Sequence, residues 1–465
     1  MLLSLLLACS SAPPEPPAKP DLVLVVVDTL RADHLGVYGH KRPTSPTMDR
    51  LAEEGMWFSR AYASSGWTLP SMASLFSGLY PHQHLVGRLT FRGTEFGKLD
   101  ASVTTVAESL GARGYRSGAV VNNTFMAPAF EMAQGFESYD YQGATNTKHR
   151  SAKETVDLGM AWLDKAGGPS FLVLHFMEPH LDYEATAPHL GAFSKGNPAA
   201  TQINLGDLVG KSHRNTVPDP AVQEFVRQRY DEEILHVDDA VSYLVDQLKA
   251  RDRWAGSIMA ITSDHGEEFW EHGGFEHGHT LMGELTRVPL IVSGGALRSS
   301  GRVDAVVEHV DLVQGLLHSA GAEPPAAAAG TSLWKIANGT ATDHDNTALS
   351  ENILYGPPKV SIVDANARLE FDFTSESGTL WGVDPDGIER RRLGPDLRAQ
   401  AGERLSAAIK KKRGSLKPID GVGGVSIADH EMFMQLQSLG YIDGAESTES
   451  TESTEPNSTT APTAP

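Results

Sequence analysis

The chain has 465 residues, of which 40% are hydrophobic, and its formal net charge is −20 at pH 7. That length is sufficient for a large buried core and for more than one domain. An acidic protein repels the phosphate backbone of DNA and RNA, so the composition argues against a nucleic-acid partner.

The first twenty residues have the pattern of an export signal followed by a tether. An apolar run ends at Leu6-Leu7-Ala8-Cys9, and Cys9 is the only cysteine in the sequence. The run is too short to cross a bilayer as a helix. It resembles the lipobox of bacterial lipoproteins, which implies that Cys9 is lipidated and that the proline-rich residues up to 20 form a tether. We therefore expect an exported protein in the bacterial cell envelope, attached to the membrane only through this lipid.

Residues 21–340 are expected to form an α/β domain. Continuous apolar runs predict buried strands, and apolar residues at helical spacing predict helices between them. The predicted strands are Asp21–Thr29, Arg116–Val121, Ser170–Met177, Ser257–Asp264 and Val288–Gly294. The predicted helices are Ser45–Glu54, Val103–Arg113, Ala152–Lys165, Pro220–Arg251 and Asp304–Ala320. This alternation indicates a large, mostly parallel sheet with helices on both faces.

Residues 341–443 are expected to form a small C-terminal α+β subdomain. Short, more polar strand-like segments begin near Thr347, and an amphipathic stretch follows them as far as Ile409. The pattern is typical of a small antiparallel sheet with a C-terminal helix. Residues 444–465 consist largely of Ser, Thr, Glu and Pro, and this composition predicts a disordered tail.

Side chains able to bind metal or move protons follow three of the predicted strands. They are Asp28, Glu178, His180, Asp264, His265 and Glu267, and the segment EHGGFEHGH adds His272, His277 and His279. Taken singly, each is more often a turn residue, a cap or a hydrogen-bonded histidine. Because ligands of open α/β sheets lie beyond the carboxyl ends of the strands, we expect several of these groups to share one site. Carboxylates and imidazoles together favour a divalent metal of the zinc or manganese type.

Thr68 stands at the predicted start of a helix in the segment SSGWTLPSMASLFSG. Thr68 and Ser71 are either simple helix caps, or Thr68 is a nucleophile. A threonine hydroxyl is a weak nucleophile at neutral pH, and coordination to a metal is one way to activate it. The helix start also offers backbone N–H groups and a positive dipole end to an anion. These features suit displacement at a phosphate or sulfate ester.

Six motifs in this order and spacing resemble the sulfatase family of the alkaline phosphatase superfamily, over roughly Asp21–Gly321. They are VVVDTLRADHLGVYG, TSPTMDRLAEEG, WTLPSMASLFSGLYPHQHLV, FMEPHLDY, TSDHGEEF and HGHTLMGELTRVPLIV. The resemblance implies a metal site made of Asp28, Thr68, Asp264 and His265, with Thr68 as nucleophile. It also implies that His180 and His279 hold the substrate oxyanion or protonate the leaving oxygen. Glu267, His272 and His277 are as readily surface or supporting residues. Sulfatases often hold calcium, which is the alternative to zinc or manganese.

The nucleophile motif departs from the family pattern. Sulfatases carry Cys or Ser-x-Pro-Ser/Ala-Arg, whose first residue is oxidised to formylglycine, whereas this chain has Thr68-Leu69-Pro70-Ser71-Met72. Threonine cannot form that aldehyde, Met72 replaces the supporting arginine, and Thr29 replaces a common second aspartate. A sulfated threonine would need water to attack sulfur, whereas a phosphothreonine at a metal site can be hydrolysed or transferred. The departure therefore favours a phosphate ester over a sulfate ester.

Three functions are consistent with these residues. The first is a metal-dependent hydrolase of phosphate or sulfate esters that forms a covalent intermediate on Thr68. The second is a transferase that passes the phosphoryl group to an acceptor alcohol. The third is a degenerate family member that binds anionic glycans or lipids without catalysis. The expected substrate is a small anionic ester, a glycan or a lipid head group.

Overall fold

The computed structural model describes residues 19–89, 95–143, 149–201, 217–384, 387–414 and 424–426. Cys9, nearly all of the expected tether and the tail at 444–465 lie outside these residues. Among the helices described, none combines the length and the hydropathy that a membrane crossing requires.

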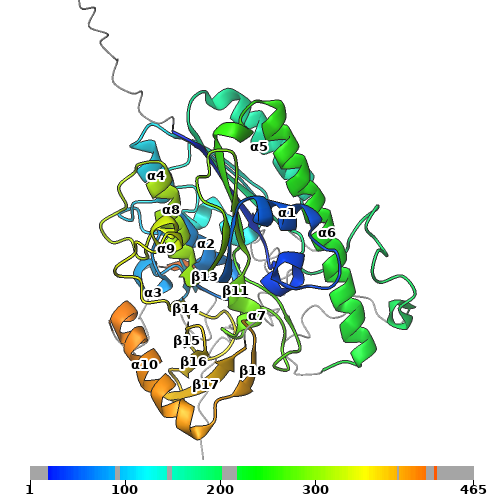
Figure 1. Ribbon diagram of the computed structural model, residues 1–465, viewed down its shortest axis with the longest axis vertical. Helices are drawn as coiled ribbons and strands as arrows, with labels where there is room; N and C mark the ends of the chain where they lie inside the picture. The colour runs from blue at the N-terminus through cyan, green and yellow to red at the C-terminus, as the bar shows by residue number, and fades with distance from the viewer. Residues whose placement is uncertain are drawn as a thin grey trace, which may run out of the picture.

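A nine-stranded sheet forms the centre of the larger domain (Figure 1). The strand order is β11-β2-β12-β8-β1-β7-β5-β6, and β13 pairs with β2. The strands are β1 Asp21–Val27, β2 Met56–Tyr62, β5 Arg116–Val121, β6 Ser138–Tyr141, β7 Ser170–Phe176, β8 Ser257–Ser263, β11 Arg287–Val288, β12 Leu290–Ser293 and β13 Gly301–Glu308. Strand β1 pairs in parallel with β7 on one side and with β8 on the other. The carboxyl ends of these three strands therefore meet at one edge of the sheet.

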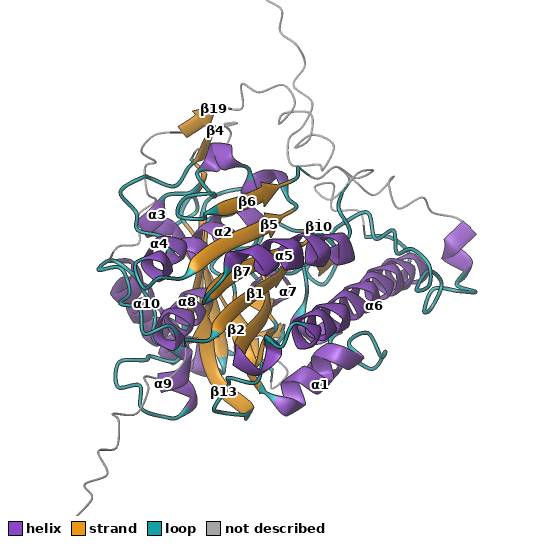
Figure 2. Cartoon of the chain, turned by 90° about the horizontal axis from the view of Figure 1, so that it is seen from above, coloured by secondary structure: helices purple, strands orange, loops and turns teal. Residues whose placement is uncertain are grey.

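Helices cover both faces of this sheet, as Figure 2 shows. On one face lie α1 Pro46–Glu54, α5 Ala152–Ala166 and α6 Pro220–Ala250, and on the other lie α2 Thr68–Ser77, α4 Val106–Gly111 and α8 His309–Ser319. Side chains of β1 alternate between the two cores: Leu22, Leu24 and Val26 enter one, and Val23, Val25 and Val27 enter the other. A strand buried on both faces needs apolar residues at every position, which explains its uninterrupted sequence.

The C-terminal subdomain is a five-stranded antiparallel sheet in the order β14-β15-β16-β17-β18. Its strands are β14 Ala348–Glu351, β15 Lys359–Val363, β16 Ala367–Asp372, β17 Ser377–Val383 and β18 Glu389–Arg392. Helix α10, Pro395–Arg413, packs Leu405 and Ile409 onto this sheet. The predicted fold class, a large mostly parallel α/β sheet with a small α+β subdomain, is confirmed.

The remaining elements are short. They are α3 Pro81–His84, α7 Gly283–Thr286, α9 Leu333–Ala337, β3 Gly87–Arg88, β4 Glu95–Gly97, β9 Glu268–Phe269, β10 Phe275–Glu276 and β19 Gly424–Ser426. Strands β9 and β10 form a small antiparallel pair, and this pair carries the histidine-rich segment.

Two local expectations were wrong, and strand β2 was missed. The single strand predicted over Val288–Gly294 is two, β11 and β12, separated by Pro289, which has no N–H to give to a ladder. Residues 304–308 of the predicted helix belong to β13, because the capping box of Glu308 and Asp311 starts α8 only at His309. Strand β2 was not predicted; its segment MWFSRAY mixes polar and apolar residues and resembles neither a fully buried nor a strictly alternating strand.

Because β1 is buried on both faces, shortening one of its side chains should destabilise the protein more than shortening an exposed side chain. Leu24→Ala should lower the free energy of unfolding by about 2–5 kcal/mol, because it leaves a cavity in the sheet core; Leu24 is 1% exposed. Leu158→Ala on α5 is the matched control, 39% exposed, and should change it by less than about 0.5 kcal/mol. Urea denaturation followed by circular dichroism measures both, and equal losses would contradict the assignment of Leu24 to the core.

Candidate active site

The edge at which β1, β7 and β8 end carries a group of buried polar side chains. Asp28 directly follows β1, and Asp264 and His265 directly follow β8. Thr68 is the first residue of α2. All four residues are 0% exposed. The structure thus brings together the residues predicted as metal ligands and nucleophile.

The side-chain atoms of Asp28, Asp264 and His265 can surround one cation, since one ligand atom from each lies within 4.8 Å of the others. His265 Nε2 lies 3.6 Å from Asp28 Oδ1 and 3.3 Å from Asp264 Oδ2. Those two carboxylate oxygens are buried and have no hydrogen-bond partner among the described residues. Buried oxygens of this kind are costly unless something positive meets them, so the donor set fits a divalent cation.

The tautomer of His265 also suits a metal ligand. Its Nδ1 lies 2.9 Å from the carbonyl oxygen of Gly266, so Nδ1 carries the proton and donates it. Nε2 is then left with a lone pair that faces the two aspartates. Burial lowers the pKa of His265 and keeps the ring neutral, which is the form that binds metal.

Two charged carboxylates in one water-excluded site raise its free energy. Burial and the charge of Asp28 raise the pKa of Asp264 to about 7. Burial would raise the pKa of Asp28 as well, but the hydrogen bond and charge of His175 and the charge of His180 hold it well below its usual value. The pKa values of the two aspartates therefore differ, as expected for two like charges buried side by side.

Thr68 is not used as a helix cap. Trp67 occupies the N-cap position of α2 and makes no side-chain capping bond, and Ser71 Oγ bonds the backbone of Ser65. Thr68 Oγ1 instead lies 3.3 Å from His265 Nε2. The hydroxyl therefore faces the candidate cation site, which removes the simplest non-catalytic explanation of this threonine.

Two residues of this site were not predicted from the sequence. Asn123 follows β5, and its Nδ2 donates to Asp28 Oδ2 at 2.7 Å and lies 3.4 Å from Thr68 Oγ1. His175, on β7, places Nε2 3.4 Å from Asp28 Oδ2. Asn123 is the second residue after a predicted strand, and this position was the available signal. His175 lies inside an apolar strand, which gave no signal.

His180 and His277 lie beside this group. Their ring centroids are 5.1 Å apart, and the His277 ring is 4.5 Å from that of His265. His277 Nδ1 donates to Glu267 Oε1 at 2.9 Å, and Glu267 Oε2 accepts from the Tyr183 hydroxyl at 3.0 Å. This series of hydrogen bonds fixes the orientation of the His277 imidazole. Burial lowers the pKa of His277 to about 4 and lowers that of His180.

His279, predicted as a catalytic histidine, contacts a different carboxylate from the one that His277 contacts. Its Nε2 pairs with Glu268 Oε2 at 2.7 Å. His277 takes the place beside His180 and His265 instead. The two histidines flank Gly278, whose φ of +83° turns the backbone between them, so their side chains reach different carboxylates. The catalytic role of His279 stays a prediction, and His277 is the histidine whose ring lies beside those of His180 and His265.

The comparisons with known proteins agree with this geometry. Residues 20–322 match the model of the sulfatase family. The multifunctional alkaline phosphatase superfamily protein of Trinickia caryophylli is 25% identical over 415 residues, covering 70% of this chain and 78% of that protein. A protein solved in complex with its substrate D-glucosamine-2-N,6-O-disulfate has a TM-score of 0.70 at 18% identity, over 86% of this chain and 99% of that chain.

A second solved structure is the phosphonate monoester hydrolase of Agrobacterium radiobacter. Its TM-score is 0.68 at 17% identity, over 85% of this chain and 95% of that chain. At these identities the two structures show a shared fold. The family model matches well over half of the 465 residues. The chain therefore belongs to the sulfatase family, and it is a sulfatase-like hydrolase of the alkaline phosphatase superfamily.

Proposed function

We propose that this protein cleaves anionic esters through a covalent intermediate on Thr68, with no formylglycine. The observation that carries the proposal is the contact of Thr68 Oγ1 with His265 Nε2 at 3.3 Å, within a set of buried carboxylates suited to a cation. Asp28, Asp264, His265 and Thr68 would hold that cation. When bound, a divalent ion supplies Lewis acidity that makes a hydroxyl nucleophilic at neutral pH.

The chain's own residues account for the remaining chemistry. Asn123 lies within reach of both Thr68 and Asp28 and orients the hydroxyl toward the ester. As the bond from Thr68 Oγ1 to the central atom forms, the bond to the leaving oxygen breaks. The leaving oxygen takes up a proton equivalent to the one the hydroxyl gives up, and His180 and His277 are the neutral imidazoles placed to carry it. Water then releases the group from Thr68.

We favour a phosphorus ester over a sulfate ester as substrate. A formylglycine hydrate expels sulfate by collapsing to the aldehyde, and Thr68 has no such exit. A phosphothreonine can be attacked at phosphorus by water, or by an acceptor alcohol if the enzyme acts as a transferase. Similarity to a phosphonate monoester hydrolase is compatible with this preference. Similarity to a protein that binds a disulfated glucosamine keeps a sulfated glycan as the competing substrate.

Binding without catalysis is the alternative function. Loss of the formylglycine residue and of its arginine motivates it. Against it, the cation ligands, Thr68 and two neighbouring histidines remain assembled and buried at one sheet edge. Loss of function seldom leaves so complete a set of catalytic groups in position.

The lipobox-like Cys9 further supports export and lipid anchoring, which mass spectrometry of the mature N-terminus would test.

Removal of the Thr68 hydroxyl should abolish catalysis. Thr68→Ala should lower kcat/KM for aryl phosphate or sulfate esters by at least about 10³-fold, because the nucleophile is lost. Thr68→Ser, which keeps the hydroxyl, should retain measurable turnover. High-resolution mass spectrometry of quenched wild-type reactions should show a phospho- or sulfo-adduct at residue 68. Full activity of Thr68→Ala would exclude this mechanism.

Chelation should remove both activity and stability. Stripping divalent ions leaves Asp28 and Asp264 facing each other in a buried site, so turnover should cease and the melting temperature should fall. Zinc or manganese should restore both, and parallel assays with calcium identify the preferred ion. Asp264→Asn should bind this ion with a much lower affinity than the wild type. Activity that persists in chelator with no bound metal would contradict a metal-dependent reaction.

His277 and His279 should differ in their effect on leaving-group dependence. If His277 helps to protonate the leaving oxygen, His277→Gln should lower kcat by about 10²–10⁴-fold on alkyl esters and much less on 4-nitrophenyl esters, whose leaving group needs no proton. His279→Gln, the matched comparison, should show a loss that does not depend on the leaving group. An identical dependence in both variants would refute the placement of His277 at the leaving oxygen.

A further inference from the structure

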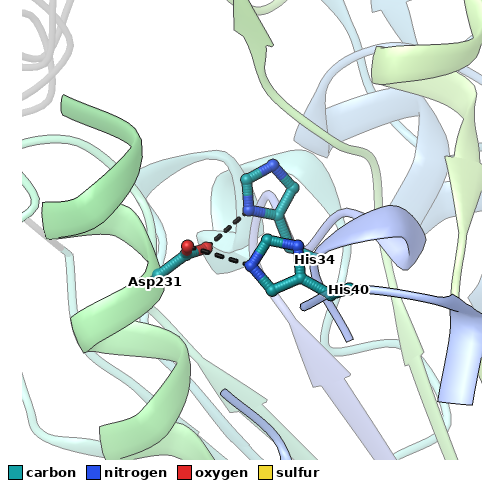
Figure 3. Close-up of side chains that lie close together, drawn as sticks. All are labelled: His34, His40 and Asp231. Carbon is teal, nitrogen blue, oxygen red and sulfur yellow. Dashed lines mark hydrogen bonds and ion pairs between the residues drawn. The ribbon is translucent and has the colours of Figure 1, made fainter. Parts of the chain in front are cut away.

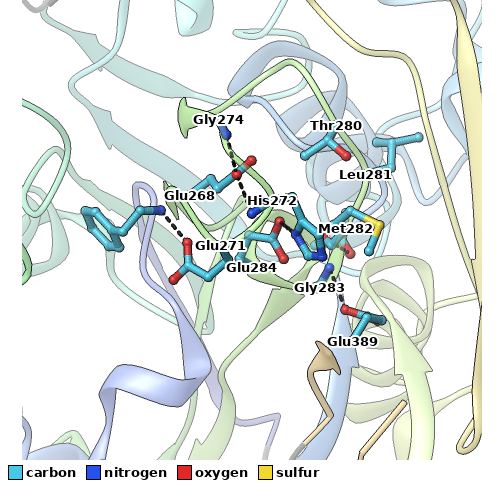
Figure 4. A network of polar contacts seen from close by, with 12 residues as sticks. Glu268, Glu271, His272, Gly274, Thr280, Leu281, Met282, Gly283, Glu284 and Glu389 are labelled. Atoms are coloured by element: carbon cyan, nitrogen blue, oxygen red, sulfur yellow. Dashed lines mark hydrogen bonds and ion pairs between the residues drawn. The ribbon is translucent and has the colours of Figure 1, made fainter. Parts of the chain in front are cut away.

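A second group of carboxylates and imidazoles lies in the segment between β9 and α7. Glu268, His272 and Glu284 each bring one ligand atom within 4.8 Å of the others. His272 Nδ1 lies 2.7 Å from Glu284 Oε1. Figure 4 shows these side chains converging from the two ends of one loop. This group is separate from the set around Thr68.

Glu284 is the unsatisfied member. The residue is 3% exposed, yet its Oε2 has no hydrogen-bond partner among the described residues. Burial and the neighbouring charges of Glu268 and Glu271 raise its pKa. A buried carboxylate oxygen without a hydrogen-bond donor is costly, so this oxygen marks a position that suits a positive ligand.

Glu268 is held in place for such a role. Its Oε1 accepts from the backbone N–H groups of His272 and Gly274, at 2.9 and 2.7 Å. Its Oε2 pairs with His279 Nε2 at 2.7 Å. The carboxylate is therefore oriented by fixed partners, as the carboxylate ligands of metals commonly are.

Another cluster of similar composition lacks this signature. His34 and His40 both point at Asp231 on α6, at 2.6 and 3.0 Å (Figure 3). Arg42 also contacts Asp231 Oδ2. Both oxygens of Asp231 are thus paired, and a guanidinium already supplies positive charge. That cluster is complete as an ion-pair network, whereas the cluster at Glu284 is not.

We infer that Glu268, His272 and Glu284 form a second binding site for a divalent cation of the zinc class, distinct from the site at Thr68. Two carboxylates and one imidazole nitrogen match the ligand preference of zinc and manganese.

The ion would fasten the loop that carries His277. The loop begins at Glu268 and ends at Glu284, so one ion closes both of its ends. Glu284 also packs against the other site: a Cβ on Gly266 would lie 2.1 Å from the Glu284 backbone oxygen, and Gly266 N donates to Leu285 O at 2.8 Å. The second ion is thus structural, and it would hold the turn after His265 and the His277 loop in a fixed relation.

Metal stoichiometry of the full chain tests this inference. Chelator-stripped protein is reloaded with ZnCl₂, desalted and analysed by inductively coupled plasma mass spectrometry. Wild type and Thr68→Ala should each hold two zinc ions, whereas Glu284→Gln and Asp264→Asn should each hold one. His272→Gln is a second variant at a partly exposed side chain, and it should also hold one.

Zinc-edge anomalous scattering from wild-type crystals provides a test that needs no variant. A peak between Glu284 and His272 is expected in addition to one at Asp28 and Asp264. One zinc per wild-type chain, unchanged in Glu284→Gln and His272→Gln, would show that the cluster consists of two ion pairs only. Wild-type protein that holds zinc at Glu284 but none at Asp28 and Asp264 would instead contradict the Thr68 mechanism and would support the second site.

Discussion

The repulsion between Asp28 and Asp264 is the constraint on which this site depends. The parallel pairing of β1 with β8 places two carboxylates side by side where the strands end, and the surrounding core excludes water. Such an arrangement is unfavourable in isolation, and it persists because the sheet fixes both backbones. Asp28, Asp264 and His265 together fit a divalent cation, and Thr68, at the start of α2, contacts His265, which follows β8.

The rest of the active site is built outward from this pair. Asn123, which follows β5, and His175 on β7 contact Asp28 Oδ2, so that Oδ1 remains open. His277 is oriented through Glu267 and Tyr183, so its position depends on a loop and not on the sheet. In the mechanism that we propose, threonine in place of formylglycine changes the route by which the product leaves.

Most of this architecture could be predicted from the sequence, for identifiable reasons. Buried parallel strands require continuous apolar runs, so β1, β5, β7 and β8 were recognisable, and the convergence of Asp28 with Asp264 followed from their position after such strands. Asn123 was missed because an asparagine after a strand is an ordinary loop residue. The choice between His277 and His279 depended on the turn at Gly278, and a two-residue spacing does not reveal which imidazole faces inward.

The contacts of the His277 loop extend beyond the segment that matches the family model. Gly283 N donates to Glu389 Oε2 at 2.9 Å, Arg368 Nη1 donates to Leu281 O at 2.8 Å, and the Thr280 hydroxyl donates to Glu370 Oε2 at 3.1 Å. Each partner belongs to the C-terminal antiparallel sheet, although the family match ends at residue 322. A truncation designed on sequence similarity would keep every candidate ligand and nucleophile. It would nevertheless remove the contacts that hold the His277 loop. The end of the family match is therefore not the end of the structure on which this loop depends.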